Sequence, residues 1–578
     1  MLQGMSSAYL IKDIKTNFDG GSNDSYPQWL TVFDGKIFFS AVDDTGQQEL
    51  WSSDATNQGT IKVGDIGGLV SGTPKHLSAG RYSLLFTAFT IDAGRELWFV
   101  NSGTQQLGAL DEVVIGGSSS SPRDIQFLYE APIYSAVDVN GARTLWRSDI
   151  ANEQLSSDHI LPSNSLLTIF DNNVYFVADY LNSGDSLWRY NGSGFNEVFD
   201  NYPDSNDDTR IRQVLASGDR LYFSASALSA RSDKLFCVNE SGEQAQLVIS
   251  GEEFDYLAPS DLIDVDGVLY FTASTDYGRD LWRVRPGELT AELVDPLNQA
   301  KGINRASELT HVDDKIFYAG TYNFDKELWV YDITNDISSL VKDINVSGDS
   351  LARIDNQLTS FGKYLLFVAE DDVYGEELWA TNGHVEGTVR LTDINEGASG
   401  SDINNLTILG NKAIFSAKSD DYGTELFGWD GEQLELAEVI EHASNHSTIH
   451  SALGKGKLKG TDSADAFVFN SYDAFKKKNA DRIIGYDSDQ GDIFAVGQGA
   501  FPGLSNQKSI DFASTKKRKE LKLLSKQDYD FVYFEKKGRL YYDGNSTEKN
   551  WGKTDEGGLF AILRGKPKLT GDDFTLLT

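Results

Sequence analysis

A unit that recurs nine times between residues 9 and 441 constrains the fold more than any other feature of the sequence. Each copy has a short apolar stretch such as IFFSA (37–41) or LYFTA (269–273), then an acidic loop with glycine, then leucine and a large aromatic residue. The aromatic residues lie 42 to 50 residues apart, and a period of about 40 to 50 residues is typical of β-propeller blades. The repeat therefore predicts an all-β propeller of about nine four-stranded units, closed as eight or nine blades, followed by a small β-rich C-terminal domain.

The recurring aromatic residue is expected to be a packing anchor between blades. Equivalent side chains at one period indicate architecture, and a large flat ring packs well between sheets. Stacking on a ligand is the alternative. The nine positions are Trp51, Trp98, Trp146, Trp188, Phe236, Trp282, Trp329, Trp379 and Phe427.

The start of the chain bears on how the ring closes. Its stretch LIKDI (10–14) is similar to VKDIN (341–345), which ends a unit. We therefore expect the N-terminal strand to complete the blade that contains AIFSA (413–417). Such a strand exchange closes the ring and removes exposed sheet edges.

The units between residues 9 and 441 resemble the bacterial ELWxxDGT repeat, also called hyalin-like. The fullest copies are residues 37–66 and 365–394, whereas Phe236 and Phe427 replace the tryptophan of the motif. The resemblance implies a secreted or cell-surface protein and specifies no biochemical activity.

Charge divides the chain into two parts. Residues 1–441 contain 29 Lys and Arg against 69 Asp and Glu, a net charge of −40, whereas residues 442–578 contain 22 against 18, a net charge of +4. An acidic field of this size disfavours nucleic acid and anionic membranes as partners. No stretch reaches the roughly 18 apolar residues that span a bilayer. The sequence therefore predicts neither nucleic-acid binding nor membrane insertion.

Acidic loops suggest calcium as a cofactor. Carboxylates beside a glycine turn are hard oxygen ligands of the kind that calcium prefers. The alternative is that each aspartate caps its own turn while glycine adopts a positive φ. The candidate ligands are Asp43, Asp44, Asp276, Asp371, Asp372, Asp420 and Asp421 in the repeats and Asp487, Asp489 and Asp492 near the C-terminus.

Residues 442–455 are expected to link the two domains and contain His442, His446 and His450. On a helix this spacing would align the three rings to hold a transition metal; a polar linker is the alternative. The sequence lacks a GxSxG nucleophile elbow and an HExxH zinc motif. No catalytic residue is predicted, and the protein is expected not to be an enzyme.

Residues 456–578 predict a small β domain with a helix only near 514–526. The stretches DAFVF (465–469), 481–492 and LYYD (540–543), followed by a terminal DFTLL, resemble the C-terminal domain of RTX-type proteins, including serralysin-like proteases. They are also similar to the tails of secreted proteins from marine picocyanobacteria. The resemblance implies export by a type I secretion apparatus and an extracellular or cell-surface location. The GGxGxD nonapeptides of that family are absent.

Together these features predict a secreted, non-catalytic binding or cell-surface protein. Its acidic propeller would face a glycan, a matrix component or a cell-surface ligand. The alternative is a secreted hydrolase or lyase that acts on polysaccharide from a site in the propeller channel. That enzyme would require unrepeated polar residues, such as an Asp/Glu pair, to converge on the channel.

Overall fold

The computed structural model divides into two compact units, Met1–Trp429 and Asp430–Thr578. Among the described residues, no helix combines the length and the apolar character needed to span a bilayer. The structure describes residues 8–16, 22–110, 112–114, 116–148, 152–162, 165–181, 184–200, 209–226, 233–239, 244–250, 257–275, 278–294, 304–322, 325–351, 353, 355–385, 387–431, 447–450, 457–459, 465–469, 475, 480–490, 492–497, 501, 504, 510–544, 551 and 557–577.

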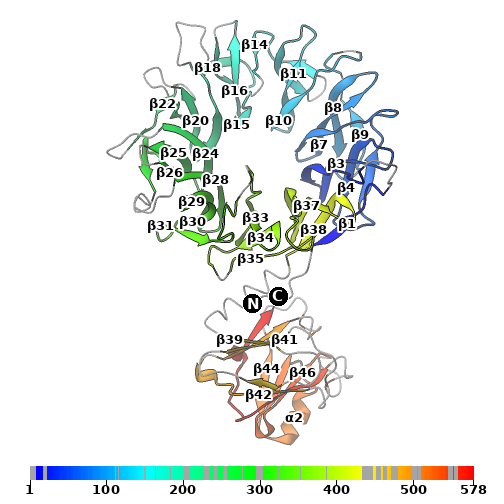
Figure 1. The fold of residues 1–578 in the computed structure, drawn as a ribbon, viewed down its shortest axis with the longest axis vertical. Coiled ribbons are helices and arrows are strands. Elements are labelled where there is room, and N and C mark those ends of the chain that lie inside the picture. The colour runs from blue at the N-terminus through cyan, green and yellow to red at the C-terminus, as the bar shows by residue number, and fades with distance from the viewer. Residues whose placement is uncertain are drawn as a thin grey trace. The chain divides into compact units, whose positions relative to one another are not determined.

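The first unit is a ring of nine antiparallel blades (Figure 1). Eight blades are continuous stretches of chain whose strands pair in order from the innermost outwards. The first four are β2 (Gln28–Phe33), β3 (Lys36–Val42), β4 (Gln48–Ser53) and β5 (Ile61–Gly64); β6 (Lys75–Ala79), β7 (Ser83–Thr90), β8 (Gly94–Asn101) and β9 (Leu107–Ala109); β10 (Arg123–Leu128), β11 (Ala131–Val137), β12 (Arg143–Ser148) and β13 (Asn152–Gln154); and β15 (Thr168–Phe170), β16 (Asn173–Tyr180), β17 (Asp185–Tyr190) and β18 (Phe195–Phe199), with β14 (His159–Ile160) also on β16. The next four are β19 (Gln213–Ser217), β20 (Arg220–Ser226), β21 (Asp233–Asn239) and β22 (Gln246–Leu247); β24 (Leu257–Val265), β25 (Val268–Thr275), β26 (Gly278–Val284) and β27 (Thr290–Leu293), with β23 (Ile249–Ser250) on β27; β28 (Asn304–Val312), β29 (Lys315–Tyr322), β30 (Asp325–Asp332) and β31 (Ile337–Lys342); and β32 (Thr359–Phe361), β33 (Tyr364–Asp371), β34 (Gly375–Thr381) and β35 (Val389–Arg390).

The ninth blade joins the two ends of the ring. Its strands β36 (Asn404–Leu409), β37 (Lys412–Ser419) and β38 (Gly423–Asp430) are followed outwards by β1 (Tyr9–Lys12) from the N-terminus. Strand β1 pairs antiparallel with β38 and places Leu10 opposite Phe427. The predicted strand exchange is confirmed, and the number of blades is nine.

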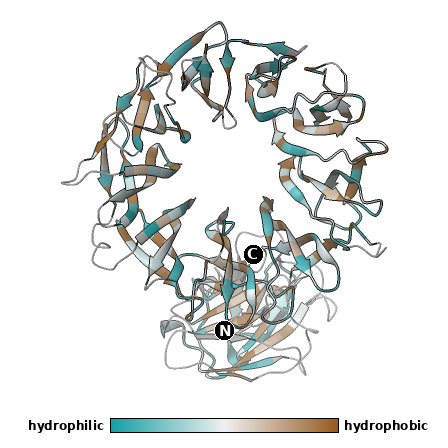
Figure 2. Cartoon of the chain, turned by 45° about the horizontal axis from the view of Figure 1, so that its top comes forward, coloured by the Kyte–Doolittle hydropathy of each residue, from teal (hydrophilic) through white to brown (hydrophobic). Residues whose placement is uncertain are grey.

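Hydrophobic stretches recur in blade after blade (Figure 2) and form a core between each blade and the next. Successive strand residues face opposite sides of a sheet. Thus Trp51 packs with Ile11 and Ile414 of the ninth blade, whereas Leu50 packs with Leu84 of the second. Eight of the nine aromatic anchors are buried, and Trp98 is half-buried.

A buried glutamate directly precedes the Leu-aromatic pair in five blades. Glu49 accepts hydrogen bonds of 3.0 Å from the backbone N–H groups of Ile66 and Gly72, which lie in the loop to the next blade. At the seam, where the ninth blade meets the first, Glu425 accepts bonds from the Ile14 N–H (3.0 Å) and the Ser25 hydroxyl (2.6 Å). Burial raises the pKa of these carboxyls, to about 8 for Glu425. The five are Glu49, Glu96, Glu327, Glu377 and Glu425.

The second unit contains two sheets that enclose one core. The first sheet is wholly parallel and consists of β39 (Ser447–His450), β41 (Asp465–Phe469), β43 (Ile493–Gly497) and β48 (Phe574–Leu577). From β39 to β43 consecutive strands alternate between the two sheets, so this part of the chain winds as a coil. The second sheet has the order β40 (Lys457–Lys459), β42 (Asp481–Ile484), β47 (Gly557–Leu563), β46 (Arg539–Asp543), β45 (Phe531–Phe534) and β44 (Phe512–Thr515).

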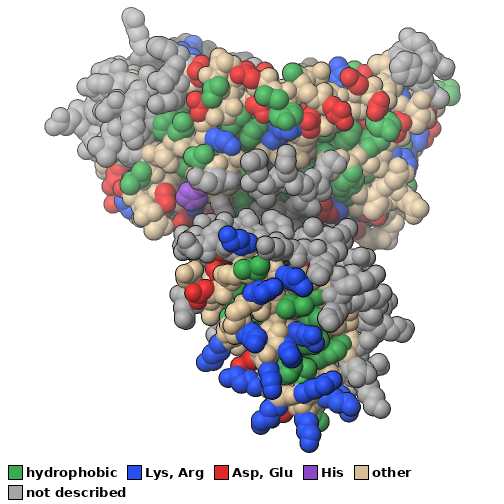
Figure 3. All heavy atoms as spheres, turned by 60° about the horizontal axis from the view of Figure 1, so that its bottom comes forward, with side chains coloured by type: hydrophobic (Ala, Val, Ile, Leu, Met, Phe, Trp, Pro, Cys, Tyr) green, Lys and Arg blue, Asp and Glu red, His purple; other side chains and the backbone are tan. Residues whose placement is uncertain are grey.

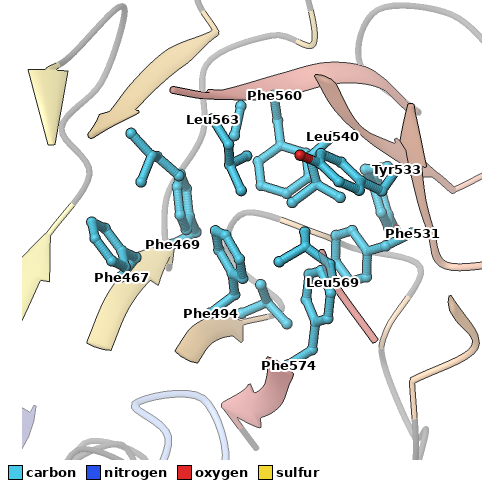
Figure 4. Packing of buried hydrophobic residues seen from close by; sticks show 14 of the residues in the cluster. Phe467, Phe469, Phe494, Phe531, Tyr533, Leu540, Phe560, Leu563, Leu569 and Phe574 are labelled. Atoms are coloured by element: carbon cyan, nitrogen blue, oxygen red, sulfur yellow. The ribbon is translucent and has the colours of Figure 1, made fainter. Parts of the chain in front are cut away.

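Aromatic rings from both sheets fill this core (Figure 4). Phe574 lies between Phe494 and Phe531, with ring centroids 5.1 and 5.0 Å away. Phe560 contacts Phe469 edge to face at 5.3 Å. Such pairs add about 0.5 to 1.5 kcal/mol beyond the burial of their area. The predicted helix is present as α2 (Arg518–Leu524).

Candidate binding site at the seam of the ring

Aspartates of the acidic loops cap their own turns. The Asp43 carboxylate accepts hydrogen bonds from the Thr45 N–H (2.9 Å) and hydroxyl (2.5 Å), and it pairs with the Lys62 ammonium at 3.0 Å. Burial acts to raise the pKa of Asp43, but these bonds outweigh it and hold the pKa below its ordinary value. Asp371 accepts bonds from the N–H groups of Val373 (2.8 Å) and Tyr374 (2.6 Å). The capping interpretation accounts for both loops.

The second aspartate of two of the pairs contacts another loop. Asp44 accepts a bond from the Thr16 N–H at 2.7 Å, and Asp372 accepts one from the Ser347 hydroxyl at 2.6 Å. Asp420 and Asp421 are exposed. Within the described residues no group of three or more His, Cys, Asp or Glu could hold a metal ion, so calcium in these loops stays a prediction. Asp276 lies outside the described residues.

Among the candidate residues of the C-terminal unit, Asp492 binds backbone N–H groups. Asp492 is buried and accepts bonds of 2.8 Å from the backbone N–H groups of Asp465 and Asp487. Burial raises the pKa of Asp492. The side chain of Asp489 and the residues His442 and His446 lie outside what the structure describes. His450 ends strand β39. The prediction that a helix would align it with the other histidines is therefore wrong at this residue.

A bulge recurs in the innermost strands and marks where the repeat varies. In six blades one non-glycine residue there has a φ of 51° to 59°, a conformation that costs about 1 to 3 kcal/mol and clusters at functional sites. Five different residue types occupy this position. The six residues are Trp29, His76, Asp124, Asp261, Glu308 and Asn405.

A long basic side chain fills the space beside the bulge in several blades. The Arg95 guanidinium donates to the Thr73 carbonyl (2.9 Å) and the Arg279 guanidinium to the Ala258 carbonyl (2.9 Å). Each carbonyl belongs to the residue three positions before the bulge. Arg143 makes the equivalent bond in the third blade. Burial lowers the pKa of Arg143 to about 10, which still leaves it charged at neutral pH.

The ninth blade has Thr424 where the second, third and sixth have arginine. The short side chain does not fill the space, and a cavity of about 410 Å³ lies there, between the ninth and first blades. This volume is within the range of small-molecule sites. It is lined by Tyr26, Pro27, Gln28, Trp29, Asp402, Asn404, Asn405, Ser416 and Thr424.

Two aromatic side chains of the first blade line this seam cavity and remain accessible. Tyr26 is 47% exposed and Trp29 39% exposed, each at a positive φ. The Trp29 ring lies 4.9 Å from that of His76 in the second blade. Burial lowers the pKa of His76, which favours the neutral imidazole beside the indole. The Tyr26 hydroxyl donates to Asp24 at 3.0 Å, and Asp24 in turn accepts the Thr424 N–H at 2.7 Å.

Amide and carboxyl groups of the ninth blade supply the polar side of the cavity. The Arg353 guanidinium donates a hydrogen bond of 2.8 Å to the Asn404 side-chain carbonyl and lies 3.3 Å from the Asp402 carboxylate. The Asn405 amide donates to the Pro27 carbonyl across the seam at 3.3 Å. The Asp402 side chain remains 64% exposed. Aromatic faces opposite fixed amides and a carboxylate suit a ligand with both apolar C–H faces and hydroxyl groups.

Sequence reasoning missed this cavity, although one signal for it was present. In three units an arginine directly precedes the position of the motif glutamate: Arg95, Arg143 and Arg279. The last unit has the smaller Thr424 at this position. The partners Tyr26 and Trp29 lie almost 400 residues earlier in the chain, so the cavity emerges only when the ring closes.

Comparison with known proteins found similarity among solved structures alone. No protein-family model matches it, and no curated protein does so in sequence. Similar solved structures include Porphyromonas gingivalis dipeptidyl peptidase 4 (10% identity, TM-score 0.43, 79% of this chain and 70% of that chain). Others are an oligogalacturonate lyase in complex with manganese (13%, 0.34, 70% and 98%) and a Mycobacterium tuberculosis puromycin-hydrolysing peptidase (12%, 0.33, 59% and 57%). The chain thus spans little more than half of that peptidase, and these similarities carry no statement about activity.

Proposed function

We propose that this protein is a secreted, non-catalytic binding protein whose seam cavity takes a neutral glycan. The observation that carries the proposal is the replacement of a space-filling arginine by Thr424, which leaves accessible faces of Tyr26 and Trp29 opposite fixed amides. Sugar rings present C–H faces to aromatic side chains and hydroxyls to amides and carboxylates. A neutral ligand also meets no repulsion from a body with a net charge of −40.

The lining favours binding over hydrolysis. Glycoside hydrolases commonly need two carboxyl groups on either side of the scissile bond. The residues that line the seam cavity include a single carboxyl group, Asp402. A polysaccharide hydrolase or lyase remains the alternative function, and release of shortened or unsaturated sugar products would favour it.

One test introduces into the ninth blade the arginine that the second, third and sixth blades have at this position. The Thr424→Arg variant should fill the cavity in the way that Arg95 fills the second blade, and the fold should persist because that blade tolerates arginine. Binding of neutral oligosaccharides, found on a glycan array and measured by calorimetry, should then be lost. Asp185→Arg places the same residue at the equivalent position of the fourth blade, which does not line the cavity, and should leave binding intact. Equal binding by all three proteins would refute the seam as the site.

A second test concerns the aromatic faces. Trp29→Ala should weaken binding of the same sugar about two- to thirteenfold, which corresponds to roughly 0.5 to 1.5 kcal/mol for a specific aromatic contact. Tyr129→Ala is the matched control, because Tyr129 is 75% exposed and lies outside the cavity. Loss of binding in the control would contradict the proposal.

We further propose that residues 456–578 direct export through a type I secretion apparatus to the cell surface or the medium. The support is the resemblance of this region to RTX-type tails and its coil of parallel strands. In the producing bacterium, inactivation of the apparatus should retain the full chain inside the cell. Unchanged export would refute this part of the proposal without affecting the glycan site.

A further inference from the structure

The second sheet of the C-terminal unit brings three basic segments to one end. Strands β44 and β45 are parallel, and β46 and β47 each run antiparallel to the preceding strand. Thr515, Phe534, Arg539 and Ile562 therefore form a row across the sheet. The segments just beyond this row are residues 516–519 (KKRK), 536–539 (KKGR) and 564–568 (RGKPK).

These three segments adjoin one another. Lys516 of the first lies 3.3 Å from Glu535, directly before the second. Gly538 has a φ of 60°, and a Cβ built on it would lie 3.3 Å from the Lys566 side chain and closer still to the Leu563 carbonyl. The described surface of the unit is correspondingly rich in lysine and arginine (Figure 3). We call these ten cations the basic end of the sheet.

Most of this charge is directed outward. Nine of the ten side chains are exposed. Two of them pair with carboxylates: Lys516 with Glu535 at 3.3 Å and Lys517 with Glu520 at 2.9 Å. Across the described part of the chain, the structure contains no ion pair to the other eight. With Glu520 and Glu535 counted, the basic end carries a net charge of +8.

Like charges so close together repel one another and destabilise the fold. Solubility does not require them, because the chain already has a net charge of −36. A concentration of positive charge inside an otherwise acidic protein therefore indicates a partner that is itself anionic. Charges more than about 8 Å away in solvent are largely screened at physiological salt, so the local charge of the basic end governs what binds to it.

The composition of the basic end distinguishes between anionic partners. It has seven lysines and three arginines. Lysine acts as a hydrated point charge, whereas arginine supplies the planar fork that reads bases and phosphates. The excess of lysine therefore argues against nucleic acid. Single-stranded nucleic acid also requires aromatic stacking platforms. In the described part of this unit, the large hydrophobic side chain that is exposed is Leu523, which is not aromatic. A second copy of the chain carries the same net charge of −36, so overall electrostatic repulsion opposes self-association.

We propose that the basic end binds an anionic polysaccharide through its sulfate, phosphate or carboxylate groups. This site is separate from the seam cavity in residues, charge and ligand. Dextran sulfate should bind the full-length protein with an affinity that falls steeply with salt, because counterions are released as the charges meet. Uncharged dextran should not bind this end.

The test uses charge reversal on the surface. Lys537→Glu with Lys566→Glu should weaken binding of dextran sulfate at least about tenfold and reduce its salt dependence. Arg81→Glu with Lys418→Glu changes the charge equally on exposed residues of the propeller and should have little effect. Circular dichroism verifies that both variants fold. Equal weakening by the two pairs would refute the basic end as the site.

Competing partners give different results. Tighter binding of single-stranded DNA than of dextran sulfate at matched charge would assign the surface to nucleic acid and overturn the proposal. Salt-sensitive self-association in sedimentation, without dextran sulfate binding, would assign it to a second copy and overturn it too. Absence of binding to every polyanion at low salt would also refute it. None of these results alters the expected behaviour of Thr424→Arg toward neutral sugars.

Discussion

Glu425 should make the stability of the ring fall as pH rises. Its carboxyl group is fully buried at the seam and accepts hydrogen bonds from the Ile14 N–H and the Ser25 hydroxyl, 411 and 400 residues earlier in the chain. Burial raises its pKa to about 8, from an ordinary value of 4.5. The folded protein therefore holds a proton that the unfolded chain releases above about pH 4.5. The contribution of this protonation to the stability of the fold is complete below about pH 4.5 and is lost as pH rises toward 8.

The size of the effect follows from proton linkage. One proton bound only by the folded state changes the free energy of unfolding by about 1.4 kcal/mol per pH unit. Between pH 4.5 and pH 7, Glu425 alone should lower that free energy by roughly 3 kcal/mol. This is a large part of the roughly 5 to 15 kcal/mol that stabilises a typical domain.

The assay compares the wild-type protein with Glu425→Gln. Urea unfolding from pH 5 to pH 8 is followed by tryptophan fluorescence, which reports mainly on the propeller because nine of the ten tryptophans lie in residues 1–429. Glutamine cannot ionise, so the free energy of unfolding of the variant should lack the fall of about 1.4 kcal/mol per pH unit that Glu425 causes. The variant should therefore become more stable relative to the wild type as pH rises. Glu370→Gln, at an exposed position, should follow the wild type. Parallel curves for the wild type and Glu425→Gln would refute the reasoning.

Other expectations follow from packing and from the loops. Trp282→Ala, at a fully buried anchor, should reduce the free energy of unfolding by about 3 to 5 kcal/mol; a loss below 1 kcal/mol in urea unfolding would contradict a packing role. Ile11→Asp, in the core at the seam, should open the ring and make it sensitive to limited proteolysis, and a protease pattern identical to the wild type would argue against closure by β1. Treatment with a chelator should leave the melting temperature unchanged, because Asp43 and Asp371 already accept hydrogen bonds within their own turns. A fall of several degrees would favour the calcium interpretation.

The repeat was sufficient to predict the ring because each blade is a local unit. The period of the apolar stretches predicted nine units closed as eight or nine blades, and the similarity of residues 10–14 to 341–345 predicted the strand exchange, since both are properties of consecutive residues. The motif glutamate was visible in the sequence but had no assigned role. Its partners, such as Ile66 and Gly72 for Glu49, are backbone groups in the following loop, and backbone groups leave no signature in residue types.

The candidate site was less accessible to sequence reasoning. The aspartates of the acidic loops suit either calcium or a capped turn, and only the positions of the Val373 and Tyr374 N–H groups show which role Asp371 performs. The seam cavity depends on contact between Thr424 and the segment that contains Tyr26. In the C-terminal unit, the alternation of strands predicted β structure, but parallel pairing depends on which distant strands become neighbours.

The strand exchange also determines when the ring can be completed. Strand β1 ends at Lys12 and its partner β38 begins only at Gly423, so β1 is synthesised long before the strand that it pairs with. At translation rates of about 5 to 20 residues per second, β1 waits roughly 20 to 80 s with its hydrogen-bonding edge unpaired. During that interval it can add to the unfinished ninth blade of a neighbouring chain as readily as to its own. A crowded ribosome cluster would therefore favour linked rings, and slow folding of the last blade would increase their yield.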